Sequence, residues 1–181
     1  SSVSFNSINI GGTTIKGYEI TLAGRGNFKE FPTSILAGYT FIDPRFDDFD
    51  PNFEGAPETQ AQINALNSSS DENILKYRSQ HLFKLDIQTE WRRFMAGVET
   101  FYASHMEAID AVFNQIVPGL SRFRDKHDQG YTLFNFRAAY SFDEHYRLSL
   151  ILNNAFNLEY SVRPGLLDAP RNLTVKFDVQ F

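Results

Sequence analysis

The chain has 181 residues, of which 42% are hydrophobic and 15% aromatic, with a formal net charge of −5. The acidic balance argues against nucleic-acid binding, and the absence of cysteine excludes disulfide frameworks and thiolate metal sites. No stretch approaches the roughly 18–20 apolar residues of a membrane helix, which excludes a helical membrane protein. The opening SSVSF has no basic or apolar leader region, so we expect any export signal to lie elsewhere or to have been removed.

Two strands are predicted in the first quarter of the chain. Residues 8–24 alternate between apolar and polar side chains, with an expected bulge near Gly17. A short connection over residues 25–31 leads to a second strand over residues 33–43. We expect this strand to end at Pro44, because proline cannot donate to a sheet ladder. A long polar loop then reaches about residue 80.

Four more strands follow as two hairpins. They span residues 81–90, 94–104, 130–142 and 146–156. The turns within the hairpins are short, at residues 91–93 and 143–145, and a second long loop over residues 105–129 separates them. In this loop Ile109, Val112, Phe113 and Ile116 recur with helical spacing. The pattern predicts a short amphipathic helix before Pro118.

The last strand, residues 170–181, follows a loop over residues 159–169 and has the strictest alternation. Its apolar face carries Leu173, Val175, Phe177, Val179 and Phe181. A soluble protein would not favour a long exposed apolar strand face. In a membrane barrel, that face meets lipid and the polar face meets a wet lumen. Aromatic residues near the predicted strand ends are typical of interfacial girdles.

Short and long connections alternate, as in outer-membrane barrels with short periplasmic turns and long extracellular loops. Seven strands are an odd number, whereas bacterial single-chain barrels have an even number. If the last strand ends in the periplasm, counting back over seven strands places the start of the first strand outside the cell. We therefore expect the chain to be the C-terminal part of a larger barrel. An additional strand within Ser1–Ile10 would instead allow a complete barrel of about eight strands.

Several segments resemble the C-terminal region of TonB-dependent outer-membrane receptors. They are NIGGTTIKGYEITLAG, YRSQHLFKLDIQ, LFNFRAAYSF and LSLILNNAFNLEYSVRPGLLDAPRNLTVKFDVQF. The most specific part is Asn153–Ser161, followed by Pro170 and Arg171 and by the terminal Phe181. The resemblance covers essentially the whole of residues 1–181. It implies an all-β fold: the last seven or eight strands of a transmembrane antiparallel β-barrel of about 22 strands, with the plug domain outside this chain.

The resemblance also implies a function: active import of a scarce, bulky nutrient across the outer membrane of a Gram-negative bacterium, energised through TonB. The expected ligand is a ferric siderophore or similar compound. A glycan-importing receptor that works with a surface lipoprotein is an alternative. The expected partners are outer-membrane lipid, lipopolysaccharide, the remaining barrel strands, the plug domain and, through the N-terminal part, TonB. A small complete membrane barrel and a soluble calyx-like binding barrel are the other interpretations.

No enzyme activity and no cofactor are expected, because the sequence has no nucleophile elbow, phosphate loop or paired-histidine zinc motif. Asp47, Asp48 and Asp50 could bind calcium, but their spacing does not fit an EF-hand loop, and we expect an acidic solvated loop without metal. The histidines form no ligand cluster in sequence, although His105 and His127 flank one loop and could approach each other.

Three groups of residues are candidate sites. The charges expected on the lumen face are Glu19, Lys84, Asp86, Glu99, Arg137, Lys176 and Asp178. They could form a hydrogen-bonded seat for the plug or could simply pair across strands. Arg122, Arg124 and Lys126 could attract an anionic ligand such as a ferric chelate, or lipopolysaccharide phosphates. The resemblance implies that Phe181, with Phe177 and Val179, is a signal for the barrel-assembly machinery.

Overall fold

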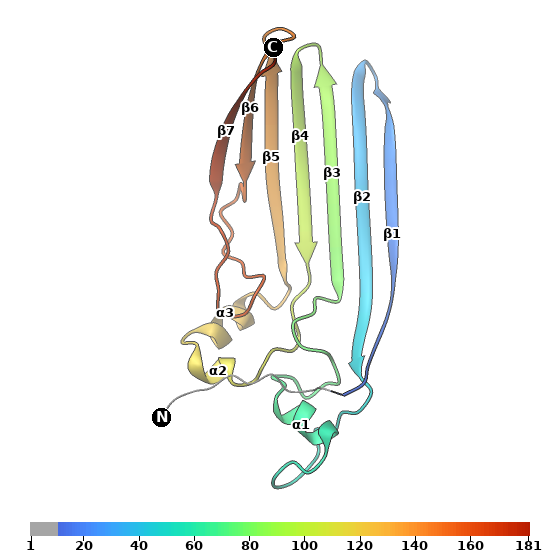
Figure 1. The fold of residues 1–181 in the computed structure, drawn as a ribbon, viewed down its shortest axis with the longest axis vertical. Helices are drawn as coiled ribbons and strands as arrows, with labels where there is room; N and C mark the ends of the chain where they lie inside the picture. The colour runs from blue at the N-terminus through green and yellow to red at the C-terminus, as the bar shows by residue number, and fades with distance from the viewer. Residues whose placement is uncertain (1–10) are drawn as a thin grey trace.

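The computed structural model describes residues 11–181 as one antiparallel sheet with its strands in chain order. The strands are β1 (Thr13–Phe28), β2 (Phe31–Phe46), β3 (His81–Trp91), β4 (Phe94–Ala103), β5 (Tyr131–Ser141), β6 (Tyr146–Asn153) and β7 (Asn172–Val179). Tight turns lie at one end of the sheet and long loops at the other (Figure 1). The all-β expectation is confirmed. The possible strand within Ser1–Ile10 lies outside the described residues.

Three short helices lie at the long-loop end (Figure 1): α1 (Gln60–Leu66), α2 (Phe113–Ile116) and α3 (Leu120–Lys126). The expected amphipathic helix is a single turn that begins only at Phe113, because Ile109 is buried outside the helix and its carbonyl accepts from Ser69 N in the other loop. Neither α1 nor α3 was predicted. No helix within residues 11–181 is long and apolar enough to cross a membrane.

β2 does not end at Pro44, contrary to the sequence prediction. Pro44 pairs with Ile15, and Asp47 N donates to Gly12 O at 3.0 Å three residues further on. Because hydrogen-bonded and non-hydrogen-bonded pairs alternate in an antiparallel ladder, Pro44 occupies a position whose backbone groups point away from β1. Its carbonyl accepts from Leu75 N at 2.9 Å on that side. The missing N–H therefore costs no bond to β1.

The expected bulge near Gly17 is also absent, since the β1–β2 register is unbroken from Thr13 to Phe28. Gly17 has a different role. A Cβ at this position would lie 2.2 Å from Phe41 O, so only glycine allows the two strands this close approach.

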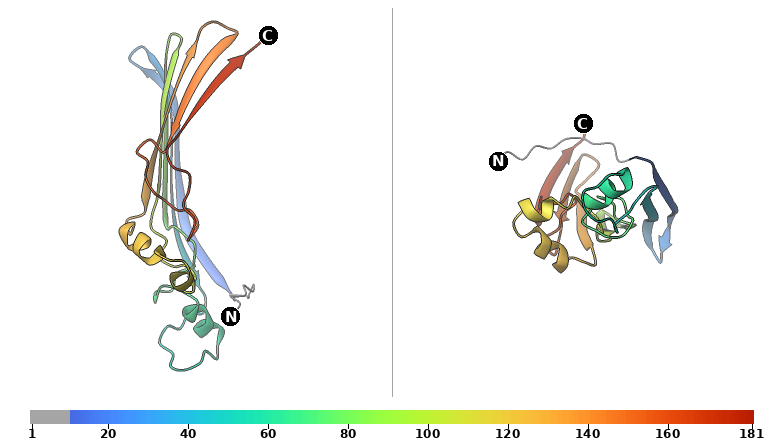
Figure 2. Two further views of the ribbon diagram at one scale, coloured as in Figure 1. Left: turned by 90° about the vertical axis from the view of Figure 1, so that its left-hand side faces the viewer. Right: turned by 90° about the horizontal axis from the view of Figure 1, so that it is seen from below.

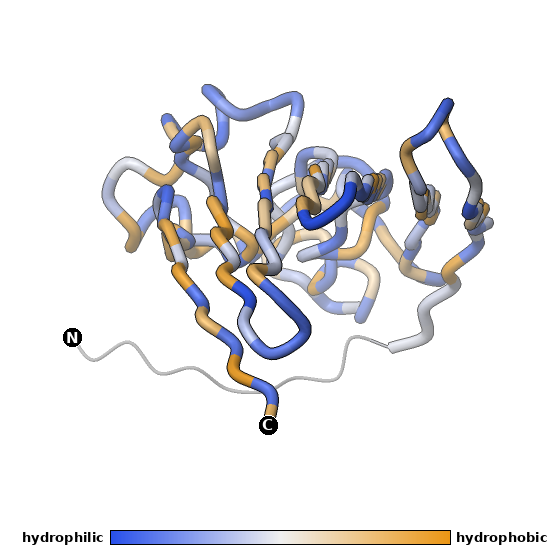
Figure 3. The backbone as a smooth tube through the Cα atoms, turned by 90° about the horizontal axis from the view of Figure 1, so that it is seen from above, coloured by the Kyte–Doolittle hydropathy of each residue, from blue (hydrophilic) through white to orange (hydrophobic). Residues whose placement is uncertain are grey.

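Hydrophobic and hydrophilic residues alternate along the strands, as the colours of the tube near the C-terminus show in Figure 3. Because successive side chains of a strand point to opposite faces, the two kinds of residue lie on opposite faces of the sheet. On the apolar face, Ile20, Leu173 and Val175 are 61–62% exposed. Nothing within residues 11–181 covers this face. In a soluble protein such a surface would be an aggregation site.

Aromatic pairs border the apolar face at both ends. The rings of Tyr18 and Phe41 are tilted, with centroids 5.5 Å apart, toward the loops, and those of Phe94 and Tyr140 are tilted, with centroids 4.6 Å apart, toward the turns. Tyr18 and Phe28 mark the two borders on β1, about ten residues or roughly 34 Å apart along the strand. With the tilt of about 40° usual for membrane strands, the band is roughly 25 Å tall, the height of the apolar band of outer-membrane barrels.

The packed core lies mainly among the loops and includes Phe46 and Ala103 at the ends of β2 and β4. Residues 47–80 and 104–130, here called the loop cap, bury Ile74, Ala108 and Ile109. Backbone bonds join the two loops, with Ser69 N donating to Ile109 O and Tyr77 N to Ala108 O, each at 2.9 Å. The two long loops therefore fold as one unit at the end of the sheet.

Candidate functional site

Arg137 on β5 is the centre of a charged network on the polar face. Its terminal nitrogens donate to the Asp86 carboxylate on β3 at 2.8 and 2.6 Å, and one also reaches Gln88 Oε1 at 3.4 Å. The intervening β4 residue is Gly97, where a Cβ would lie 2.6 Å from Arg137 Nε. The glycine therefore lets the guanidinium lie flat across β4 and bind β3.

A second series of polar contacts runs beside the first, closer to the long loops. Lys84 Nζ lies 2.9 Å from Glu99 Oε1. Asn135 donates to Glu99 at 3.1 Å, and its carbonyl oxygen accepts from Asn154 N at 2.9 Å. The contacts thus link β3, β4 and β5 to the end of β6.

All seven charges expected on the lumen side lie on the polar face of the sheet. Lys84, Asp86, Glu99 and Arg137 are brought together and pair with one another. Lys176 and Asp178 pair along β7 at 2.6 Å, and Glu19 on β1 has no bonding partner within residues 11–181. The four charges Lys84, Asp86, Glu99 and Arg137 therefore stabilise the sheet by pairing across strands.

The three basic residues of α3 have different environments. Arg124 is half-buried and donates to Met106 O at 2.7 Å and to Glu107 O at 3.4 Å. Burial lowers the pKa of its guanidinium. Arg122 and Lys126 are exposed and make no ion pair in the described part of the chain. Arg124 therefore holds the helix to the loop cap, and only its two neighbours are free to meet an anion.

The remaining candidate ligands are engaged elsewhere. Asp47 accepts from the Thr14 hydroxyl at 2.7 Å, and Asp50 accepts from Asn52 N at 3.1 Å. His105 and His127 do approach each other, since His105 Nδ1 lies 3.1 Å from His127 O. Among residues 11–181, no three histidine or acidic side chains are grouped so that they could hold a metal ion.

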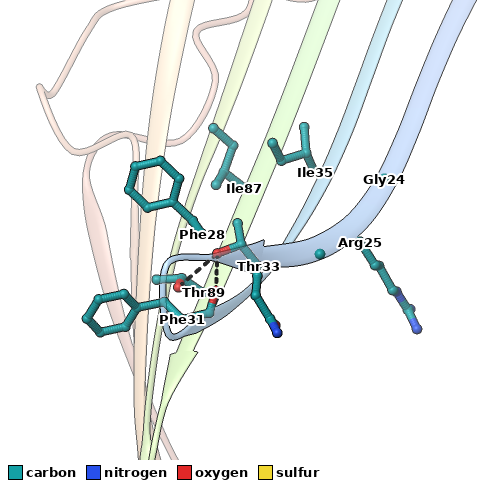
Figure 4. A pocket seen from close by; sticks show the side chains of 10 residues that line it. Gly24, Arg25, Phe28, Phe31, Thr33, Ile35, Ile87 and Thr89 are labelled. Atoms are coloured by element: carbon teal, nitrogen blue, oxygen red, sulfur yellow. Dashed lines mark hydrogen bonds between the residues drawn. The ribbon is translucent and has the colours of Figure 1, made fainter.

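An apolar hollow of about 780 Å³ lies near the β1–β2 turn (Figure 4). Phe28, Phe31 and Ile87 line it, and its hydroxyls, Thr33 and Thr89, lie 3.2 Å from each other. It opens on the apolar face, and most of its lining is apolar. Its lining suits contact with lipid at the border of the apolar band and not recognition of a polar ligand.

The residues of the expected assembly signal lie at the end of β7. Phe177 stacks on Tyr146 of β6 at 6.0 Å, and Val179 pairs with the same residue. Gln180 N continues the ladder to His145 O at 2.9 Å, and Phe181 beyond it is fully exposed. Phe177 and Val179 therefore share the apolar face, and Phe181 follows beyond the end of β7.

Sequence reasoning missed several elements of this arrangement. The loop-cap helix α1 has a capping box in which Thr59 accepts from Gln62 N at 3.3 Å, and the pattern TQAQ signals it. Asn154 closes the loop after β6, with bonds to Leu158 N and O at 2.8 and 2.9 Å. The contact of Gly97 with Arg137 has no sequence signal, because it depends on register.

Comparison with known proteins places this geometry in a family. The family model for the TonB-dependent receptor-like β-barrel matches residues 1–155. The crystal structure of the ferric-catecholate import receptor Fiu from E. coli K12, in its closed form, is similar with a TM-score of 0.66 and 18% sequence identity. The match covers 93% of this chain and 21% of that receptor, so the chain spans about a fifth of its length. At that identity the likeness concerns the fold alone.

A comparison with curated proteins gave no match. The family assignment therefore rests on the family model, which covers most of the chain, and agrees with the seven-stranded sheet and its two opposed faces. The family comprises receptors and transporters, not enzymes. The chain belongs to the TonB-dependent receptor-like β-barrel family.

Proposed function

We propose that this chain forms the C-terminal part of the barrel of a TonB-dependent transporter in the outer membrane of a Gram-negative bacterium. It supplies about seven of about 22 strands, together with outward-facing loops. The main supporting observation is the sheet itself, whose exposed apolar face is bordered by aromatic residues and backed by a polar, charge-paired face. Lipid would cover the first face, and the lumen with its plug would adjoin the second.

In this proposal the wall remains rigid while TonB acts on the plug. The Arg137–Asp86 pair joins two strands across a third, so it resists shear between β3 and β5. Energy transmitted to the plug then displaces the plug and does not distort this part of the barrel. The chain contributes a fixed frame and the loop surface that first meets the ligand.

We propose a ferric siderophore as the ligand, met by Arg122 and Lys126 of α3. Ferric chelates are commonly anionic, and exposed cations near the mouth would attract them. Arg124 would position the helix from within the loop cap. The structural similarity to a ferric-catecholate import receptor supports testing a catecholate first.

The test uses the intact natural receptor that carries this segment. A mass several-fold above 20.7 kDa is the first expectation. Whole cells should then take up a radiolabelled ferric catecholate only while the proton-motive force and TonB are present. The Arg122→Ala, Lys126→Ala double variant should raise the half-saturating concentration by about tenfold, since two charge-assisted contacts are lost.

Lys29→Ala in the β1–β2 turn, at the opposite end of the sheet, is the matched control and should behave as wild type. Uptake that does not depend on TonB would refute the transport proposal. Wild-type uptake by the double variant would refute only the ligand-contact assignment.

We also propose that Phe177, Val179 and Phe181 act as the terminal assembly signal. The apolar face shared by Phe177 and Val179 and the exposed terminal ring of Phe181 support this role. Deletion of Phe181 should lower the amount of assembled receptor in the outer membrane, measured by the mobility shift between unheated and heated samples. Normal assembly of the deletion variant would exclude the role.

A further inference from the structure

The apolar hollow near the β1–β2 turn extends across three strands. Gly24 and Gly26 of β1 line one side, Ile35 of β2 and Ile87 of β3 lie beside them, and Phe28 borders the turn (Figure 4). A Cβ at either glycine would meet no atom within 4 Å, so packing inside the sheet does not require glycine at these positions. The hollow of about 780 Å³ can therefore be occupied without displacing any part of the sheet.

The polar groups around the hollow do not require a polar ligand. The hydroxyls of Thr33 and Thr89 lie 3.2 Å from each other, and Thr33 also donates to Phe31 O at 3.0 Å. Arg25 and Asn27 alternate with the glycines along β1, so their side chains belong to the polar face. Figure 4 shows Arg25 directed away from the hollow. The ligand that fits is therefore largely hydrocarbon.

An exposed cation lies at the turn-side border of the hollow. Trp91 follows Thr89 on the apolar face of β3, roughly 7 Å further along the strand. The guanidinium carbon of Arg92 lies 5.1 Å from the centre of the Trp91 ring. Apart from this contact, Arg92 has no hydrogen bond or ion pair within residues 11–181. Its guanidinium is therefore available to an anion.

The other charges at this border leave it net positive. Lys29 and Glu30 are adjacent in the β1–β2 turn and offset each other. Arg93 donates to a backbone carbonyl oxygen at 2.6 Å and keeps its charge. Glu90 lies on the polar face, where Gln88 donates to it at 3.3 Å. An apolar hollow that ends at a cationic border is complementary to an amphiphile with a hydrocarbon chain and an anionic head.

We infer that the hollow binds one hydrocarbon chain of an anionic glycerophospholipid, with the lipid phosphate on Arg92. The inference rests on the proposed function, because it requires the apolar face to lie in the outer membrane with the tight turns toward the periplasm. A guanidinium can bind phosphate through two parallel bonds.

The hollow stays open to the bilayer in this arrangement. At the turn end the β1–β2 hairpin diverges from β6 and β7 (Figure 2), so the C-terminal strands do not cover it. A further barrel strand beside β1 would extend the sheet in its own plane and would add a wall, not a roof. Lipid can therefore reach the hollow from the side.

The experiment measures lipid binding to the full receptor in detergent by native mass spectrometry. Phosphatidylglycerol is the anionic probe, and phosphatidylethanolamine with the same acyl chains is the zwitterionic control. We expect wild type to bind phosphatidylglycerol more tightly, and Arg92→Gln to weaken that binding by about fivefold, as for one interfacial cation. Arg163→Gln removes the same charge at the long-loop end and should have no effect. Equal binding of the two lipids by wild type would overturn the inference.

A second pair of variants tests the hollow itself. Gly26→Leu fills it and should weaken phosphatidylglycerol binding by at least about tenfold, since the hydrocarbon chain loses its buried contact area. Ala138→Leu adds bulk to the same face on β5 and should bind as wild type. Gly24→Leu replaces Gly26→Leu if the latter fails to fold, as judged by the heat-dependent mobility shift.

The outcomes separate this inference from the proposed function. A receptor that inserts into vesicles and transports normally, but whose phosphatidylglycerol binding is unchanged by Arg92→Gln or by filling the hollow, would overturn the inference alone. A receptor that does not insert into lipid would refute the proposed function as well.

Discussion

The sheet and the loop cap treat the same kinds of hydrophobic residue in opposite ways. On the sheet, Ile20 and Leu173 are more than 60% exposed, whereas in the loop cap Ile109 is fully buried. The loop cap is built like an ordinary water-soluble domain, with its own core and cross-loop backbone bonds. The sheet instead leaves most of its apolar face exposed, as a lipid-facing surface would be. The chain thus combines a loop cap suited to water with a sheet face suited to lipid, and the two meet at the ends of the strands.

The largest expected effect is on the loop cap. Ile109→Ala removes a fully buried side chain, which should destabilise the packed loops by about 2–5 kcal/mol. Because the strands do not depend on this core, the barrel should still assemble. Protease applied to whole cells should cut the loops of the variant faster than those of wild type, while the heat-dependent mobility shift of the barrel stays unchanged. Loss of both properties would mean that the cap and sheet form one cooperative unit.

The next test concerns whether the apolar face of the sheet contacts lipid. Leu22→Arg places a charge on the apolar face near the middle of the band, at a cost of about 2–4 kcal/mol in a bilayer. Thr21→Arg, on the polar face of the same strand, is the control and should be tolerated. Folding yield into lipid vesicles distinguishes them. Equal yields would show that the apolar face does not meet lipid.

A smaller effect is expected from the charge network. Asp86→Asn removes the carboxylate that binds Arg137 through two bonds, and should cost about 1.5–3 kcal/mol, the usual value for hydrogen bonds to charged groups. Denaturant midpoints of the folded barrel in detergent measure this loss. Asp178→Asn, which affects only a pair along one exposed strand, should cost clearly less. Similar losses of stability in the two variants would indicate that the ion pair across β4 stabilises the sheet no more than the pair along β7 does.

The smallest expected effect is at α1. Thr59→Ala removes the side-chain half of the capping box and should cost the helix about 1 kcal/mol. The change should appear as faster hydrogen exchange in residues 60–66 only. Thr59→Ser keeps the hydroxyl and should restore protection, whereas slowed exchange or a change across the sheet would contradict the assignment.

The sequence alone was sufficient for the strands, the turns and the family. Period-2 alternation is a local signal, because successive side chains of a strand point to opposite faces whatever the strand's partner is. For that reason the two faces and the short turns after Trp91 and Ser141 were predictable. The ends of the strands were less predictable. β2 continues through Pro44 because the register with β1 directs the backbone groups of Pro44 away from β1, and no local sequence signal indicates this register.

Only the tertiary structure decided which polar residues meet. Asp86 and Arg137 are 51 positions apart, and their contact depends on the order of three strands and on a glycine between them. Arg122 and Arg124 look alike in sequence, but the fold of the loop cap buries one and leaves the other exposed. Arg147 is unpaired because Lys176 takes the carboxylate opposite it. Alternation depends on neighbours in the chain, whereas pairing depends on neighbours in space, and only the folded sheet determines the second.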